Sequence, residues 1–193
     1  LFMLALRLAD PGMLRPELAR MVPPDALGHA AAVWIDDGMP ERTTEVLGPL
    51  FEQTDILDER HEYSFDVLMD ALQAQGLEAR RYALAQRVAG ARNRQLASAA
   101  RGRMVSMLAD SGETRAAWAL FKESQRYDPE NPQFWHLELT LLLSEDRTEE
   151  ARMRSSVLAA KARRAGLMDL AEMLTDMGTH GLPGAQDWEG DDL

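Results

Sequence analysis

Apolar residues recur at helical spacing along most of the chain, and glycine or proline interrupts them at intervals. The clearest stripe consists of Phe65, Leu68, Met69 and Leu72, at positions i, i+3, i+4 and i+7. This spacing places all four side chains on one face of a helix. Similar stripes precede and follow it, so the pattern predicts an all-α protein.

The interruptions are regularly spaced. Gly38, Gly76 and Gly112 each separate two apolar stripes, and they are 38 and 36 residues apart in the sequence. Because glycine enters turn conformations without steric cost, each break predicts a tight turn between two antiparallel helices. Repetition with a period of 20 to 50 residues is the signature of a helical-repeat protein.

Capping residues predict where several helices begin. Asp25 is a favoured N-cap, so we expect a helix to start after it. Asn131 followed by Pro132 predicts another start, since proline suits the first helical position. Short helices are expected over residues 1–9 and 14–21.

The last third of the chain predicts a long helix and a short final one. The long helix runs over residues 148–164 and buries Ala151, Ser155, Leu158 and Ala162, and Gly166 ends it. The final helix carries Met168, Ala171, Leu174 and Met177. Terminal helices of this kind cover the end of a repeat stack.

One segment carries the marks of a known repeat. In a unit counted from Ser98, Gly112 stands at the turn, Ala117 at a small position, Phe121 at an aromatic position and Pro129 at the end. This arrangement resembles the tetratricopeptide repeat. The first helix departs from the family at Arg101, Val105 and Leu108.

The next unit, counted from Pro132, repeats part of the pattern. Trp135 and Ala151 match the family, whereas Asp146 replaces the turn glycine and Ser155 the aromatic. The resemblance, clearest over residues 98–165, implies a right-handed α-α superhelix of antiparallel helix pairs. We expect this domain over residues 1–177, as a piece of a longer array, and an acidic tail over 178–193.

The resemblance also implies a concave groove lined by particular first-helix positions. Carried over to this sequence, these positions hold Tyr63, Asp66, Asp70, Gln73, Ser106, Gln133, His136 and Thr140. They include no lysine or arginine, which disfavours a clamp for a carboxylate terminus. The residues predict a partner-binding groove.

Charge narrows the classes of partner. The net charge is -11 and the isoelectric point is near 4.8, which argues against nucleic acid because its binding depends on neutralising phosphates. A basic protein partner is favoured instead. The chain has no cysteine, which excludes disulfides and thiolate metal sites.

The charges are unevenly distributed along the chain. Residues 36–70 contain eleven acids and two arginines, whereas residues 80–103 contain seven arginines and no acid. Either adjacent helices neutralise each other, or the arginines form a docking site for an anionic partner or for the acidic tail. The seven are Arg80, Arg81, Arg87, Arg92, Arg94, Arg101 and Arg103.

The sequence offers little material for catalysis. The four histidines, His29, His61, His136 and His180, have no second ligand at a metal-binding spacing. No phosphate-binding loop or nucleophile motif occurs. We therefore predict no catalytic residue, no metal and no cofactor. No segment reaches the roughly 20 apolar residues of a membrane helix.

The main hypothesis is a non-catalytic scaffold that mediates protein–protein interaction within a larger bacterial assembly. A first alternative, implied by the resemblance, is part of a Gram-negative export machine that binds a cationic polysaccharide or its modifying enzyme. A second is a regulatory domain of a larger enzyme or transcription factor. The compartment is open between periplasm and cytoplasm, and the export hypothesis favours the periplasm.

Overall fold

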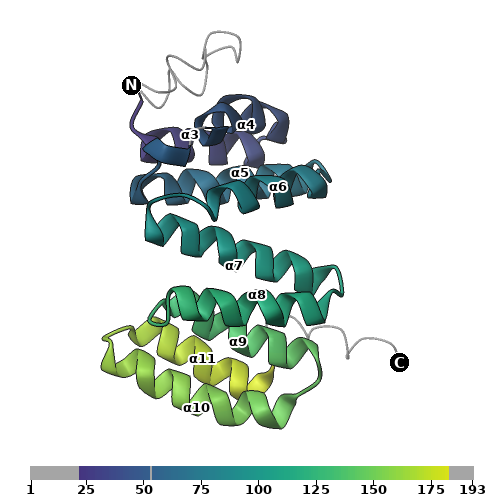
Figure 1. Ribbon diagram of the computed structural model, residues 1–193, viewed down its shortest axis with the longest axis vertical. Coiled ribbons are helices and arrows are strands. Elements are labelled where there is room, and N and C mark those ends of the chain that lie inside the picture. Colours follow the sequence, from purple (N-terminus) through teal and green to yellow (C-terminus); the bar gives the residue numbers. More distant parts are fainter. Residues whose placement is uncertain (1–21, 53, 183–193) are drawn as a thin grey trace. The chain divides into compact units, whose positions relative to one another are not determined.

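A computed structural model describes residues 22–52 and 54–182, apart from the side chain of Asp55 (Figure 1). All regular secondary structure in these residues is helical, which confirms the all-α prediction. The helices predicted over residues 1–9 and 14–21, and most of the acidic tail, lie outside the described residues. The chain divides into two compact units, Leu1–Met104 and Val105–Leu193.

The first unit is built from helix pairs. Helix α3 contacts α4 and α5, α4 also contacts α5, and α5 contacts α6. A series of short 3-10 segments joins α4 to α5. The elements are α3 (Pro24–Asp36), α4 (Pro40–Leu47), η2 (Gly48–Glu52), η3 (Thr54–Ile56), η4 (Glu59–His61), α5 (Glu62–Ala74), α6 (Glu78–Val88) and the first part of α7 (Arg94–Asp110).

The second unit begins inside α7 and has a similar pattern of neighbours. Helix α8 contacts α9, α9 contacts α10 and α11, and α10 contacts α11 along its length. Its helices are α8 (Thr114–Tyr127), α9 (Pro132–Ser144), α10 (Thr148–Arg164) and α11 (Met168–His180). Helix α10 has the predicted bounds, and α11 extends three residues beyond the predicted domain boundary at 177.

The core of the first unit contains the stripe found in the sequence. Phe65, Leu68, Met69 and Leu72 are at most 1% exposed, and the Phe65 ring lies 5.9 Å from the ring of Phe51. Burying a side chain of this size contributes about 1.5–3 kcal/mol. This face of α5 therefore holds the unit together.

The apolar residues Val46, Leu47, Leu50 and Phe51 predict one returning helix after the turn at Gly38, and the observed helix is shorter. Val46 and Leu47 lie in α4, but Leu50 and Phe51 lie in the 3-10 segment η2. The expectation of one helix carrying all four was wrong. The cause is Pro49, which follows the last α-helical bond, from the Gly48 N–H to the Thr44 carbonyl, and has no N–H to continue the ladder.

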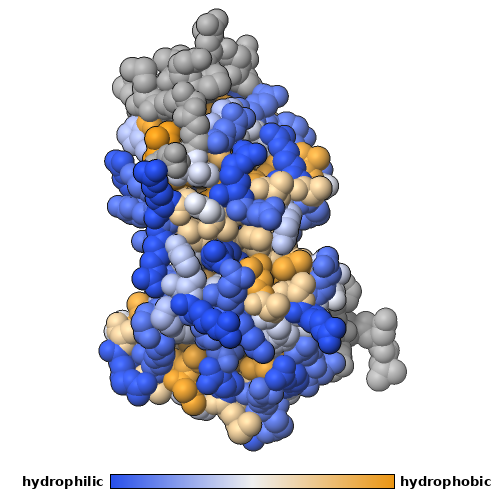
Figure 2. All heavy atoms as spheres, in the orientation of Figure 1, coloured by the Kyte–Doolittle hydropathy of each residue, from blue (hydrophilic) through white to orange (hydrophobic). Residues whose placement is uncertain are grey.

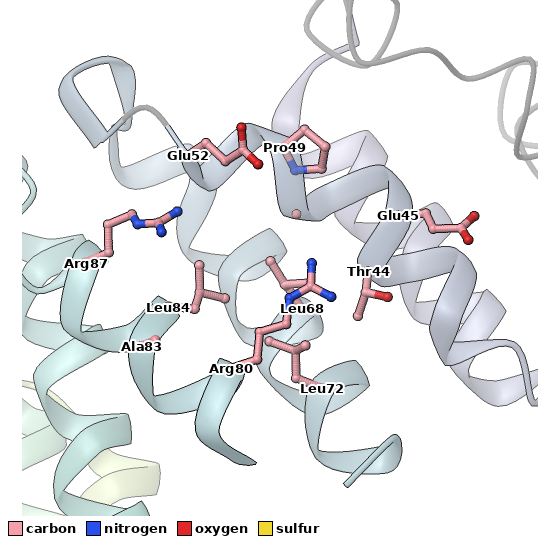
Figure 3. A pocket seen from close by; sticks show the side chains of 11 residues that line it. Thr44, Glu45, Pro49, Glu52, Leu68, Leu72, Arg80, Ala83, Leu84 and Arg87 are labelled. Atoms are coloured by element: carbon pink, nitrogen blue, oxygen red, sulfur yellow. The ribbon is translucent and has the colours of Figure 1, made fainter. Parts of the chain in front are cut away.

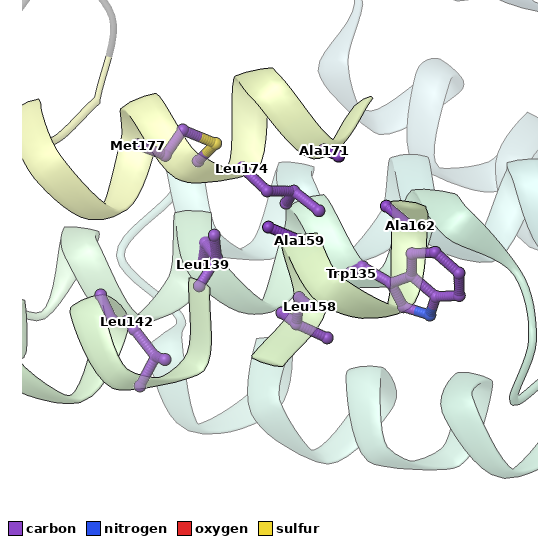
Figure 4. Close-up of a cluster of buried hydrophobic side chains, with 10 residues drawn as sticks. Trp135, Leu139, Leu142, Leu158, Ala159, Ala162, Ala171, Leu174 and Met177 are labelled. Carbon is purple, nitrogen blue, oxygen red and sulfur yellow. The ribbon is translucent and has the colours of Figure 1, made fainter. Parts of the chain in front are cut away.

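The core of the second unit joins three helices (Figure 4). Trp135 and Leu139 of α9, Leu158 of α10, and Leu174 and Met177 of α11 are all buried in it. The four residues predicted to face inward on α10 are buried, whereas Met168 is mostly exposed at the start of α11.

Close packing of α10 on α11 depends on two small residues. A side chain at Gly178 would overlap the hydroxyl of Ser155. Ser155 stands where the resembled family has an aromatic residue, and a ring there would not fit against Gly178. The departure from the family pattern therefore has a local packing reason.

The predicted turns share one backbone geometry. Gly38, Gly76, Gly112 and Gly166 have φ between 67° and 77°, and Asp146 has φ 57°. At each turn this residue donates its N–H to the carbonyl three residues back, and the next residue donates to the carbonyl five residues before itself. These bonds satisfy carbonyls at the helix end, as in a Schellman motif.

Two predicted helix starts have different outcomes. Asn131 caps α9 as expected, because its side-chain oxygen accepts a bond from the Gln133 N–H at 3.0 Å and Pro132 follows. Asp25 does not cap α3, which starts one residue earlier at Pro24. Proline at the first position needs no partner for an N–H, so Asp25 lies inside the first turn.

Candidate binding surfaces

The groove residues predicted on α5 share one side of that helix. Tyr63, Asp66, Asp70 and Gln73 follow each other at intervals of three and four residues, which keeps them in line. Tyr63 is 41% exposed, and its ring lies 4.6 Å from the His29 ring of α3. Helices α3 and α5 therefore both contribute to this surface, which we call the α5 face.

An arginine from the other predicted site reaches the same face. The Arg103 Nε donates to Asp66 Oδ1 at 2.9 Å, and Arg103 Nη1 lies 3.5 Å from Asp70 Oδ1. The sequence predicts the groove acids and the arginines as two separate surfaces. Here one of the seven arginines neutralises two of the groove acids, in line with the simpler interpretation that adjacent helices pair their charges.

Burial affects the charge state of this cluster. Desolvation raises the pKa of Asp66, while the neighbouring Arg103 lowers it and Asp70 raises it further. Asp70 itself is 54% exposed at its side chain. The α5 face thus carries a half-exposed carboxylate, Asp70, paired with Arg103, and an exposed tyrosine ring two helical turns away.

The remaining groove candidates belong to the second unit. Gln133, His136 and Thr140 lie along one side of α9, and Thr140 donates its hydroxyl to the His136 carbonyl at 3.2 Å. His136 is half-buried, and desolvation lowers the pKa of its ring. Ser106 is a half-buried residue of α7. This set is polar and uncharged at neutral pH, unlike the acidic set of the first unit.

The seven arginines occupy different environments. Arg81 is only 6% exposed and contacts Glu78 at 3.2 Å, and Arg103 is held by the acids described above. Arg101 is half-buried, and Arg92 and Arg94 are exposed. Arg80 and Arg87 are exposed and make no hydrogen bond or ion pair with any described residue.

Arg80 and Arg87 line a hollow of about 290 Å³ in the first unit, the α6 hollow (Figure 3). Its other wall comes from the end of α4 and from η2. The lining residues are Thr44, Glu45, Gly48, Pro49, Glu52, Leu68, Leu72, Arg80, Ala83, Leu84 and Arg87.

The α6 hollow has charges of both signs at its rim. Figure 3 shows Arg80 and Arg87 extending from α6 into the hollow, with Glu52 across from them and Glu45 directed away. Guanidinium groups without partners offer forked donors to a carboxylate. The geometry allows reversible binding of a polar segment.

A second hollow was not found by sequence reasoning. It has a volume of about 860 Å³ in the second unit, and Trp118 of α8 lies beside it. The Trp118 Nε1 donates to Glu145 at 2.9 Å, and the Arg147 guanidinium lies 5.4 Å from the ring centroid. The available signal was the run from Arg115 to Lys122, in which two cations flank a tryptophan on one helix face.

Within the described part of the chain, no group of three or more histidine, aspartate or glutamate side chains is placed to hold a metal ion. Two of the four histidines, His61 and His29, contact neighbouring side chains. His61 Nδ1 lies 2.8 Å from Asp58 Oδ1, and the His29 ring lies 4.6 Å from the Tyr63 ring in a tilted arrangement.

Among the described helices, none combines the length and apolar character needed to cross a membrane. The face seen in Figure 2 is mainly hydrophilic, with apolar side chains scattered between charged ones. A comparison with protein-family models, curated proteins and solved structures found no match for this chain. The proposed function therefore rests on the residues of this chain alone.

Proposed function

We propose that this chain is a non-catalytic scaffold of tetratricopeptide-like repeats that binds a protein partner within a larger assembly. The repeated turn supports this: Gly38, Gly76, Gly112 and Asp146 each close a helix pair with the same two backbone bonds. Each pair is one repeat. The same turn follows α10 at Gly166, and its recurrence within successive helix pairs at similar spacing is typical of repeat arrays.

The contacts inside each unit support the finer architecture. In the first unit α3 contacts its own returning helix and also the first helix of the next pair, α5. In the second, Ala117 and Phe121 pack with Phe134 of the next pair. Successive pairs that bury each other's apolar faces build a right-handed superhelix in this family.

The observation that carries the proposed function is the α5 face. Arg103 holds Asp66 and Asp70 in place, and Tyr63 packs beside His29, so the side chains of three helices are positioned before a partner arrives. Ordering side chains in advance lowers the entropic cost of binding. Asp70 is half-exposed and can accept a second cationic donor beside Arg103, and the Tyr63 ring is exposed on the same face, which suits a basic protein segment.

The test is affinity capture with this chain from cells that naturally produce it, followed by identification of bound proteins. The Asp70→Lys chain reverses the charge of the face, and the Glu172→Lys chain reverses an exposed acid of α11 as a matched control. A partner lost with Asp70→Lys and kept with Glu172→Lys supports the scaffold. Equal recovery of every partner from both chains contradicts it.

A cationic polysaccharide is the second candidate ligand for the same face. The presence of an exposed ring and a half-exposed carboxylate on one helix face favours it, since sugar rings stack on aromatic side chains while ammonium groups pair with acids. Titration with chitosan oligomers separates the two. Saturable, salt-sensitive binding that Tyr63→Ala and Asp70→Asn both weaken favours the polysaccharide.

A further inference from the structure

The hollow beside Trp118, which we call the α8 hollow, lies between helices of the second unit. One wall is α8, the floor is the end of α9, and the other wall is the start of α10. It is lined by Thr114, Arg115, Trp118, Ala119, Lys122, Glu138, Leu142, Glu145, Arg147 and Glu150. Six of these residues carry charge, so the pairing among them decides what the hollow attracts.

All three acids of the α8 hollow have cationic partners. Arg154 Nε and Nη2 donate to Glu138 at 2.6 and 2.8 Å. Arg147 donates to Glu145 at 2.8 Å and to Glu150 at 2.7 Å. Hydrogen bonds from Arg147 and Trp118 lower the pKa of Glu145, so this carboxylate stays ionised and bonded to them at neutral pH.

The cations that face these acids from α8 are unpaired. Arg115 and Lys122 are exposed and make no hydrogen bond or ion pair with the described residues. They lie one on each side of Trp118, at positions i, i+3 and i+7 of one helix face. Arg147 and Arg154 offset two of the three acidic charges, and Arg115 and Lys122 add two positive charges, so the α8 hollow is net positive although the whole chain is strongly negative.

We propose that the α8 hollow binds an acidic segment of a partner protein, with carboxylates on Arg115 and Lys122 and an apolar or aromatic side chain on Trp118. This inference rests on the proposed scaffold function and names a second surface with its own partner chemistry. Charge complementarity identifies the occupant, because an arginine fork and an ammonium group both pair well with carboxylates.

The spacing fits an extended peptide. Residues i and i+7 of a helix are separated by about 10.5 Å along its axis, and three residues of an extended chain span about 10 Å. Two carboxylates two or three residues apart therefore reach both cations. The Trp118 ring lies between the cations along the helix, where the side chain between the two carboxylates would meet it.

The experiment uses a fluorescein-labelled peptide in which four acidic residues flank one tryptophan, titrated with the full chain and followed by anisotropy. The matched peptide has glutamine and asparagine in place of the acids. The test variant is Arg115→Glu with Lys122→Glu, and the control is Arg126→Glu, an exposed arginine of α8 that does not line the hollow.

We expect the double variant to bind the acidic peptide at least about tenfold more weakly, as for loss of charge-assisted bonds, and the control to stay within about twofold. Circular dichroism checks that both variants keep their helices. Equal binding of the neutral peptide, or an unchanged affinity of the double variant, would overturn the proposal.

Two further arms separate the possible occupants. A thymidine decamer that binds more tightly than the peptide, through the same residues, overturns the peptide assignment, because cations beside an aromatic also suit single-stranded nucleic acid. The other arm replaces four acids of the chain itself with neutral residues: Asp187, Glu189, Asp191 and Asp192. Tighter peptide binding by this variant supports an acidic ligand, because the unmodified acidic segment would compete with the peptide for the hollow.

The outcome is distinguishable from that of the scaffold proposal. If the peptide does not bind but Asp70→Lys still abolishes partner capture, only the inference about the α8 hollow fails. If the peptide binds as expected while capture is insensitive to Asp70→Lys, the α5 face fails and the α8 hollow stands.

Discussion

The α6 and α8 hollows occupy corresponding places in the two units. Each lies between the returning helices of neighbouring pairs, α4 and α6 in the first unit and α8 and α10 in the second. Leu72 and Leu142, each four residues before a left-handed turn, belong to the two floors. The same local backbone therefore produces a hollow twice.

The side chains at corresponding positions differ in kind. Eight residues before and after the turn, the first unit has Leu68 and Leu84, which are 1% and 9% exposed. The second unit has Glu138 and Arg154, which form a bidentate ion pair. An apolar pair and an ion pair thus occupy the same place in the repeat, each internally satisfied.

Corresponding rim positions of the two hollows also carry opposite charges. Arg80, four residues after Gly76, has no partner among the described residues, whereas Glu150, four residues after Asp146, is held by Arg147. The free cations therefore come from α6 in one hollow and from α8 in the other. The same backbone geometry in two units does not imply the same ligand, because the side chains that have no partner among the described residues determine what binds.

The largest effect is expected when a buried leucine of the first unit is replaced by the glutamate found at the corresponding position of the second unit. Leu68→Glu buries a carboxylate without a partner, and we expect it to lower the free energy of unfolding by about 3–5 kcal/mol. Adding Leu84→Arg supplies the partner and should recover part of the loss. Urea unfolding followed by circular dichroism measures both, and a loss below about 1 kcal/mol for the single variant contradicts the comparison.

Replacing the ion pair of the second unit with leucines should change the free energy of unfolding by a smaller amount. Arg154→Leu removes both bonds to Glu138, whose side chain is 12% exposed, and should cost about 2 kcal/mol. The double variant Glu138→Leu with Arg154→Leu copies the first unit and should unfold within about 1 kcal/mol of the unmodified chain. If the double variant is the less stable of the two, the positions are not equivalent.

The turns give a third test. Asp146 has φ 57°, a conformation that costs an L-residue more than it costs glycine. Asp146→Gly should therefore stabilise the chain by about 0.5–1 kcal/mol, and Gly76→Asp should destabilise it by about 1 kcal/mol. Thermal unfolding of the two variants checks the sign, and destabilisation by Asp146→Gly would show that its side chain has another role.

The smallest effects concern pH. Asp66 and His136 each lie ten residues before a turn, and burial disfavours the charged form of both, raising the pKa of Asp66 and lowering that of His136. The stability from neutral His136 is present above its ordinary pKa of about 6.5 and is lost as pH falls. The stability from protonated Asp66 is present below about pH 3.9 and is lost as pH rises.

The measurement compares the pH dependence of the free energy of unfolding of the unmodified chain with that of a variant in which the titrating residue is replaced. Relative to His136→Asn, the unmodified chain should lose stability between pH 7.5 and 5. Relative to Asp66→Asn, it should lose stability as pH rises from 4 towards neutral. Parallel pH profiles for the unmodified chain and either variant would remove that residue from the comparison.

Several features could be predicted from the sequence because they depend on neighbours along the chain. The turns at Gly38, Gly76 and Gly112, the cap at Asn131 and the bounds of α10 follow from backbone preferences and from apolar periodicity. The early end of α4 at Pro49 was also within reach, since a proline stops the helical ladder wherever it falls. Tyr63, Asp66, Asp70 and Gln73 were expected in a groove because of the resemblance to tetratricopeptide repeats; the structure places all four on α5, and their role in binding stays a prediction.

Charge pairing could not be predicted in the same way. Arg103 and Asp66 are 37 residues apart, and no local pattern indicates that they meet, that Arg81 is buried, or that Arg80 and Arg87 have no partner among the residues that the structure describes. Arg154 and Glu138 belong to different helices, and their contact depends on how α9 packs against α10. Backbone turns have short range and are encoded locally, whereas the pairing and burial of long charged side chains depend on which helices the fold brings side by side.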